Sequence, residues 1–126
     1  MNKKILTILC ISYNHENFIK QALESFVAQK TNFSFEVLVS DDAWTDNTAK
    51  IIEEFAKQYP EIIKPILRQQ NVGFWENFIG IAEMVETKYV SLCEGDDYWI
   101  DENKLQKQVD FLEKNPKVLK VILVAS

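Results

Sequence analysis

The sequence predicts an α/β fold, with a mainly parallel sheet of about five strands and helices on both faces. Apolar runs of strand length alternate along the whole chain with stretches in which apolar residues recur every three or four positions. Such alternation implies right-handed crossovers between parallel strands. The chain also has the size and composition of one globular domain, residues 1–126, because 47% of its residues are hydrophobic and it holds only three Gly and three Pro.

Five apolar runs are predicted to be strands. They are Ile5–Ile11, Phe35–Ser40, Ile62–Leu67, Tyr89–Cys93 and Val118–Val124. The first run is continuous and contains β-branched residues, which indicates a strand that is buried on both faces. Pro65 removes one hydrogen-bond donor from the third strand, and this favours a position at the edge of the sheet.

Helical spacing predicts a helix between each pair of consecutive strands. The apolar stripes run from Phe18 to Val27, from Ile51 to Ala56, from Phe74 to Val85 and from Leu105 to Leu112. Helix-start chemistry precedes three of them, at Asn14 or Asn17, in the run 45–48 and at Asp101. Trp75 lies on the third stripe and Trp99 follows the fourth strand. We interpret both as core aromatic residues rather than as walls of a sugar pocket.

Composition and charge exclude several classes of protein. The net charge of −5 argues against a nucleic-acid-binding protein, and an anionic ligand would need a cation as intermediary. Cys10 and Cys93 lie inside apolar runs and are interpreted as small buried hydrophobic residues, not as zinc ligands. The first apolar run lacks a signal-peptide cleavage site, and no run is long enough to span a membrane. We therefore expect a cytoplasmic protein, with the cytoplasmic face of the membrane as an alternative location.

Four predicted strands end in polar clusters. These are Ser12-Tyr13-Asn14, Ser40-Asp41-Asp42, Arg68 with Asn71, and Glu94 to Asp97. Because ligands bind at the carboxyl ends of parallel strands, which share one edge of the sheet, the clusters predict a single ligand site. The carboxylates between Glu94 and Asp97 suit a hard cation such as Mg²⁺ that also holds a diphosphate, and Gly95 lets the backbone approach it. The alternative is an acidic turn that is merely solvated.

In these motifs the chain resembles the family 2 glycosyltransferases, nucleotide-sugar-dependent enzymes with the GT-A fold. The matching segments are Ile11–Glu16, Glu36–Asp42, Thr45–Thr48, Asn71–Gly73 and Glu94–Trp99. Their order and spacing extend over residues 5–125. The resemblance implies a Rossmann-like GT-A nucleotide-binding half of an enzyme that transfers sugar from a nucleotide-diphosphate sugar to an acceptor hydroxyl, with inversion. The acceptor would be a glycan or a lipid-linked molecule, and the product a cell-surface polysaccharide.

The resemblance further implies which residues bind the donor. They are Ser12, Tyr13, Asp41, Arg68, Asn71 and Asp96. Tyr13 would pack against the base, and Asp41 would accept a hydrogen bond from it. A carboxylate at this position suits the N3–H of the uracil in UDP and disfavours cytosine, which lacks that proton. Arg68 either steadies a phosphate or lies in solvent.

Asp96 and Asp97 match the DxD-type metal site of the family, in which the last Asp holds Mn²⁺ or Mg²⁺ on the diphosphate. The ion would act as a Lewis acid and neutralise charge on the leaving nucleoside diphosphate. Trp44 departs from the family pattern, because members usually carry a small residue there. This departure predicts a shifted loop or a different cover over the base.

The general base of the family is an acid in the second half of a longer catalytic domain, past a strand that Val118–Val124 resembles. We expect that this chain is truncated before the acceptor-binding half and transfers sugar slowly or not at all. We also expect self-association through the sheet edge that truncation would expose. His15 is interpreted as a loop histidine bonded to backbone, not as the base.

Two other functions remain as alternatives to the enzyme. One is a non-catalytic nucleotide-binding module that keeps the donor pocket. The other is an α/β interaction domain with a solvated acidic edge, which would bind no nucleotide. A phosphotransfer receiver domain is set aside, because Ser12-Tyr13 and Arg68 stand where it would need acids.

Overall fold

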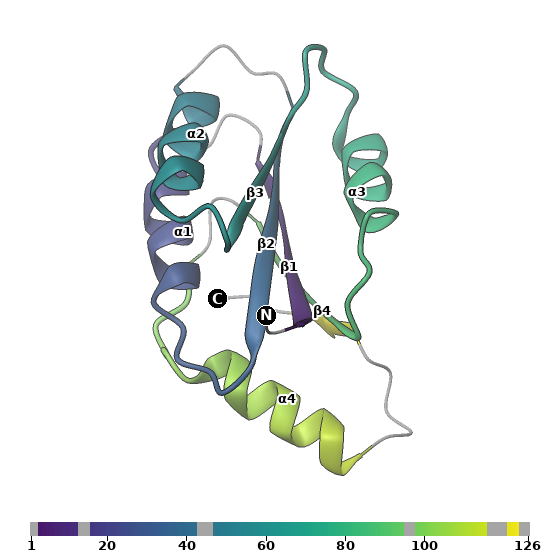
Figure 1. The fold of residues 1–126 in the computed structure, drawn as a ribbon. Coiled ribbons are helices and arrows are strands. Elements are labelled where there is room, and N and C mark those ends of the chain that lie inside the picture. The colour runs from purple at the N-terminus through teal and green to yellow at the C-terminus, as the bar shows by residue number, and fades with distance from the viewer. Residues whose placement is uncertain (1–2, 13–15, 43–46, 95–97, 116–120, 124–126) are drawn as a thin grey trace.

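The computed structural model describes residues 3–12, 16–42, 47–94, 98–115 and 121–123, and in these ranges strands and helices alternate as predicted. The elements are β1 (Lys4–Ser12), α1 (Ile19–Val27), β2 (Ser34–Asp41), α2 (Thr48–Gln58), β3 (Ile63–Leu67), α3 (Phe74–Ala82), β4 (Tyr89–Glu94), α4 (Lys104–Lys114) and β5 (Val121–Leu123). Figure 1 shows α1 and α2 on one face of the sheet and α3 on the other.

The strands form one parallel sheet in the order β3-β2-β1-β4-β5. Four strands have five residues or more, whereas β5 contributes three. The α/β class with a parallel sheet is thereby confirmed. β3 lies at the edge of this sheet, where Pro65 pairs in register with Val39, so the edge position expected from Pro65 is also confirmed.

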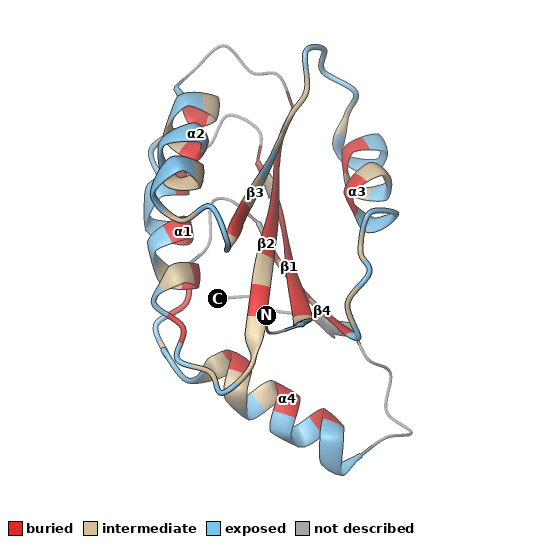
Figure 2. Ribbon diagram, viewed as in Figure 1, coloured by how far each residue is buried: buried red, intermediate tan, exposed pale blue. Residues whose placement is uncertain are grey.

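Side chains of β1 pack against helices on both faces of the sheet. Leu6, Ile8 and Cys10 are fully buried in the larger hydrophobic cluster, which includes residues of α1, α2 and α4. Leu9 points the other way, into a smaller cluster with Ile81 of α3. This alternation is the geometry of a strand that is covered on both faces. Figure 2 shows the resulting band of buried residues along the central strands.

The two tryptophans that were predicted to lie in the core differ in how far they are buried. Trp99 is 5% exposed and its ring lies 4.9 Å from that of Phe26, so its core assignment is confirmed. Trp75 is 69% exposed on α3, so its core assignment is wrong. Cys10 and Cys93 are buried as predicted, side by side in the register of β1 and β4.

Two helix ends differ from the prediction. α3 ends at Ala82, three residues before Val85, because the chain tightens there into a turn in which the Met84 N–H bonds to the Ile81 carbonyl at 3.1 Å. α4 begins at Lys104 with Asn103 in the cap position. Asp101 accepts the N–H of Asn103 at 2.9 Å and thus stabilises the turn before the helix instead of capping it.

Candidate functional site

The carboxyl ends of the strands bring the predicted polar clusters to one edge of the sheet. Ser12 of β1 is the register partner of Asp41 of β2, and the N–H of Arg68 donates to the Asp41 carbonyl at 3.2 Å. On the other side of β1, Ile11 pairs with Glu94 of β4. The strand order reverses its direction between β1 and β4, and ligands of open parallel sheets bind at such a reversal.

Asp42 is buried and fastens the end of β2 to the start of α3. One of its carboxylate oxygens accepts the N–H of Val72 at 2.8 Å, and the other accepts the N–H of Gly73 at 2.9 Å. Its own N–H donates to the carbonyl of Ser12 at 3.0 Å. A buried carboxylate is stable only when hydrogen bonds replace the water it has lost, and these backbone donors provide that replacement. We call this arrangement the Asp42 clasp.

The clasp determines the path of the loop before α3. Gly73 has φ +89° and ψ 164°, a backbone conformation that is essentially restricted to glycine. Asn71 is exposed in this loop, and its side-chain amide donates to the carbonyl of Asp42 at 3.2 Å. The loop thereby holds Asn71 at the edge where β1 and β2 end.

Arg68 and Asn77 form a second connection between the sheet and α3. The Nε–H of Arg68 donates to Asn77 Oδ1 at 2.7 Å, and its NH2 group donates to the Asn77 carbonyl at 3.3 Å. The hydroxyl of Ser40 donates to the same Asn77 Oδ1. Two of the five guanidinium N–H groups of Arg68 are therefore used on α3. A role of Arg68 toward a phosphate stays a prediction.

Asn77 is not among the site residues predicted from the sequence, although the sequence holds a signal for it. Asn77 and Ile81 are the buried residues of α3, and they stand four positions apart on one face of that helix. A polar residue at the spacing of the buried stripe indicates a buried hydrogen-bonding role, because an amide is costly to bury without partners.

Ser12 and Asp41 are both buried at the same edge. The hydroxyl of Ser12 has no hydrogen-bond partner among the residues that the structure describes. The other predicted site residues, Tyr13, Asp96 and Asp97, lie outside the described ranges, as do His15 and Trp44. The structure thus places Ser12, Asp41, Arg68 and Asn71 together, and it describes the strand from which the Asp96 segment leaves.

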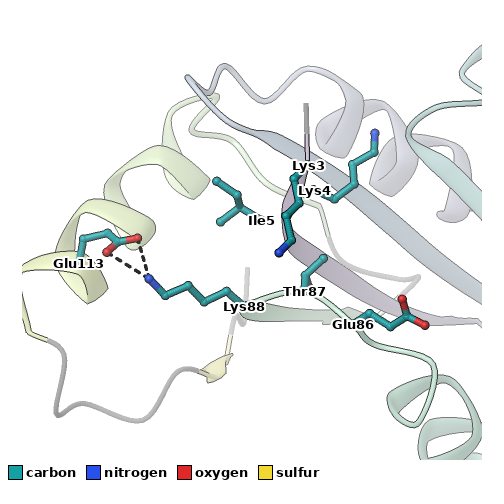
Figure 3. Close-up of a pocket in the computed structure, with 7 residues that line it drawn as sticks. All are labelled: Lys3, Lys4, Ile5, Glu86, Thr87, Lys88 and Glu113. Atoms are coloured by element: carbon teal, nitrogen blue, oxygen red, sulfur yellow. Dashed lines mark hydrogen bonds and ion pairs between the residues drawn. The ribbon is translucent and has the colours of Figure 1, made fainter. Parts of the chain in front are cut away.

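The opposite edge of the sheet, where the strands begin, carries a pocket of about 420 Å³. Its lining is shown in Figure 3 and consists of Lys3, Lys4, Ile5, Glu86, Thr87, Lys88 and Glu113. Lys88 Nζ lies 3.3 Å from Glu113 Oε1, and both side chains are about half exposed. The Tyr89 side chain and then Glu113 raise the pKa of Lys88, because both interactions favour its charged form.

The described residues lack two features. None of their helices is long and apolar enough to cross a membrane. Within the same ranges, no group of three or more His, Cys, Asp or Glu side chains is arranged to hold a metal ion. The carboxylates expected to bind a metal are outside these ranges.

Comparison with known proteins gives consistent results. A sequence model of the family described as "Glycosyl transferase family 2" matches residues 7–125. An uncharacterized protein of Mycobacterium tuberculosis is 48% identical over 112 residues, which cover 89% of this chain and 32% of that protein. The dTDP-rhamnosyl transferase RfbG of Shigella flexneri is 35% identical over 109 residues, which cover 82% of this chain and 37% of the relative. The chain spans about a third of the length of these curated relatives.

Solved structures share the fold. The structure of S. aureus TarS 1–349 in complex with UDP-GlcNAc has a TM-score of 0.76 and 26% identity, and the match covers 89% of this chain and 32% of TarS. The mannosyltransferase PcManGT from Pyrobaculum calidifontis, in complex with GDP-Man and Mn²⁺, has a TM-score of 0.76 and 21% identity, over 85% of this chain and 32% of that enzyme. The second likeness is one of fold alone.

Proposed function

Because the chain belongs to glycosyl transferase family 2, we propose that it forms the donor-binding part of an enzyme that transfers a sugar from a nucleoside diphosphate to an acceptor hydroxyl. The observation that carries this proposal is the convergence of Ser12, Asp41, Arg68 and Asn71 at the reversal in strand order. A solvated acidic edge would not need its acids buried, whereas Asp41 and Asp42 are each only 2% exposed.

The base of the donor is proposed to contact Tyr13 and Asp41. An ionised carboxylate only accepts hydrogen bonds, so Asp41 suits a base that carries a ring N–H. Uracil and thymine both have this donor at N3, and cytosine does not. UDP-GlcNAc in the TarS complex and dTDP in the name of RfbG are consistent with this class of base. Asp41 would therefore disfavour CDP-sugars without separating UDP from dTDP.

The diphosphate is proposed to lie near Ser12, Arg68, Asn71 and Asp96, with a divalent cation held by Asp96 and Asp97. The chemistry of these carboxylates fits a hard cation such as Mn²⁺ or Mg²⁺. Their place in the sequence also fits, since residues 95–97 follow directly after Glu94, the last residue of β4, which pairs with Ile11 of β1. When bound, the ion would neutralise the charge of the departing diphosphate.

For the complete enzyme, we propose transfer with inversion to a glycan or lipid-linked acceptor on the cytoplasmic side of the membrane. Inversion requires a general base within hydrogen-bonding reach of the acceptor hydroxyl. We assign that role to none of the described acids. The part played by this chain is to bind the donor and orient its diphosphate.

The test is thermal unfolding of this chain with UDP, dTDP or CDP, each with and without Mn²⁺. A nucleotide at 100 times its dissociation constant stabilises the native state by about 2.7 kcal/mol, which is several degrees for a domain of this size. We expect a shift with UDP and dTDP that requires Mn²⁺ and is lost in the Asp96→Ala, Asp97→Ala double variant. Asp110→Ala, on an exposed face of α4, is the matched control.

Absence of a shift with every nucleotide would overturn the donor-site proposal and favour the interaction domain. A shift that needs no metal and survives the double variant would overturn the metal site alone.

A further inference from the structure

We propose that Asn77 is a positioning residue of the donor site, which acts through Ser40 and Arg68 on the end of β2. The inference rests on the proposed function and deepens it. Asn77 lies in the first half of α3 and its side chain is fully buried, so it does not reach the donor from solvent.

The side-chain amide of Asn77 is held in one orientation. Arg68 Nε can only donate, so the Asn77 atom that it contacts at 2.7 Å must be the oxygen. Because the oxygen faces this way, the hydroxyl of Ser40, which contacts the same atom, must donate as well. One amide oxygen therefore links β2, the residue after β3, and α3.

The two residues that Asn77 holds lie on either side of Asp41. Ser40 precedes Asp41 in β2, and Arg68 donates its backbone N–H to the Asp41 carbonyl across the ladder. Displacement of either one would move the backbone that carries the Asp41 carboxylate. Asn77 thereby influences the residue that is proposed to recognise the base, without touching the base.

Gly80 shows that α3 is shaped to receive the Arg68 side chain. A Cβ at Gly80 would overlap the NH2 group of Arg68, so any larger residue would force the guanidinium away from the helix. Gly80 lies inside α3, where glycine normally lowers helix stability relative to alanine. The close approach of the Arg68 guanidinium explains why a glycine occupies this position in the helix.

The test is calorimetric titration of this chain with UDP and with CDP, in Mn²⁺, at a temperature where every variant is folded. Asn77→Ala removes the shared acceptor, and we expect it to weaken UDP binding about tenfold. We also expect the preference for UDP over CDP to fall, because the carboxylate of Asp41 loses its alignment. A purely structural role would lower the melting temperature without changing this preference.

Two further variants separate positioning from folding. Asn77→Asp keeps an oxygen for Ser40 and Arg68, and it should restore most of the affinity and of the preference for UDP. Gly80→Ala displaces Arg68 while introducing a better helix former, so it should weaken UDP binding even if the melting temperature does not fall. Glu83→Ala, at the exposed end of α3, is the control and should bind UDP as the wild type does.

Unchanged UDP affinity and unchanged preference in Asn77→Ala would overturn the inference and leave the donor site standing. If Asn77→Ala does not fold, the same measurements on Gly80→Ala test the inference, and unchanged UDP affinity with an unchanged preference for UDP over CDP would overturn it. Failure of the wild type itself to bind any nucleotide with Mn²⁺ would overturn the proposed function, and with it the role of Asn77.

Discussion

The two edges of the sheet use charged side chains in different ways. At the carboxyl-end edge, Asp42 is 2% exposed and both of its oxygens accept backbone N–H groups within 2.9 Å. At the amino-end edge, the side chains of Lys88 and Glu113 are 50% and 51% exposed and meet at 3.3 Å. The Asp42 carboxylate determines the path of the backbone around it. The Lys88–Glu113 ion pair lies on backbone whose path is already determined.

Burial and the type of partner decide how much a charged side chain contributes to stability. An exposed ion pair is screened by water and salt, and it loses side-chain entropy when it forms. A buried carboxylate that accepts two backbone donors cannot be removed without leaving those donors unsatisfied. We therefore expect the carboxyl-end edge to respond strongly to substitution and the amino-end edge weakly.

Asp42→Ala tests the contrast with the largest expected effect. It removes the acceptor of Val72 and Gly73, and we expect a loss of about 2 kcal/mol of unfolding free energy, or roughly 5–10 °C in melting temperature. Asp110→Ala removes an exposed carboxylate that accepts a hydrogen bond from Gln106, and it should change the melting temperature by about 1 °C or less. Equal effects of the two substitutions would refute the distinction between the buried and the exposed carboxylate.

Gly73→Ala tests the backbone that the clasp holds. A Cβ at this position would meet no atom within 4 Å, so the substitution adds strain without adding a clash. At φ +89°, we expect a cost of about 1–2 kcal/mol, measured by chemical denaturation. Gln70→Ala, at an exposed position of the same loop, is the control. A stabilised Gly73→Ala protein would show that the loop does not need this conformation.

Glu113→Gln tests the amino-end edge and has the smallest expected effect. We expect a decrease in melting temperature of about 1 °C or less at low salt, and none at high salt. The pKa of Lys88 is raised above 10.5 in the folded state, so the stability linked to its charge is complete below that pH and is lost as the pH rises through the folded pKa. The difference between wild type and Glu113→Gln should therefore disappear in strongly alkaline buffer, and a large neutral-pH difference would contradict the comparison.

Much of the architecture follows from signals that are local in the sequence. The run Ile5–Ile11 and the spacing of the apolar stripes were sufficient to predict β1 and the alternation of strands and helices. Pro65 predicted the edge strand, because a missing backbone donor is tolerated only there. The polar ends of the strands predicted that Ser12, Asp41, Arg68 and Asn71 lie at one edge, since parallel strands end at a common edge.

What the sequence does not contain is the pairing of distant polar groups. Asp42 contacts Val72 and Gly73, which lie about thirty positions later, and no periodicity relates them. Trp75 was misjudged for a different reason. Helical spacing shows which side chains share a face, but Trp75 lies on a face of α3 that the rest of the described chain does not cover.

The place of β1 in the sheet has a consequence for the order of folding. β1 pairs with β2, which follows it after a single helix. It also pairs with β4, which follows only after α1, β2, α2, β3 and α3. During synthesis, the segment from β1 to β3 can therefore assemble early, while the other side of β1 stays without its strand partner until residues 89–94 have left the ribosome. We expect the reversal in strand order, and with it the proposed donor site, to be among the last parts of the fold to form.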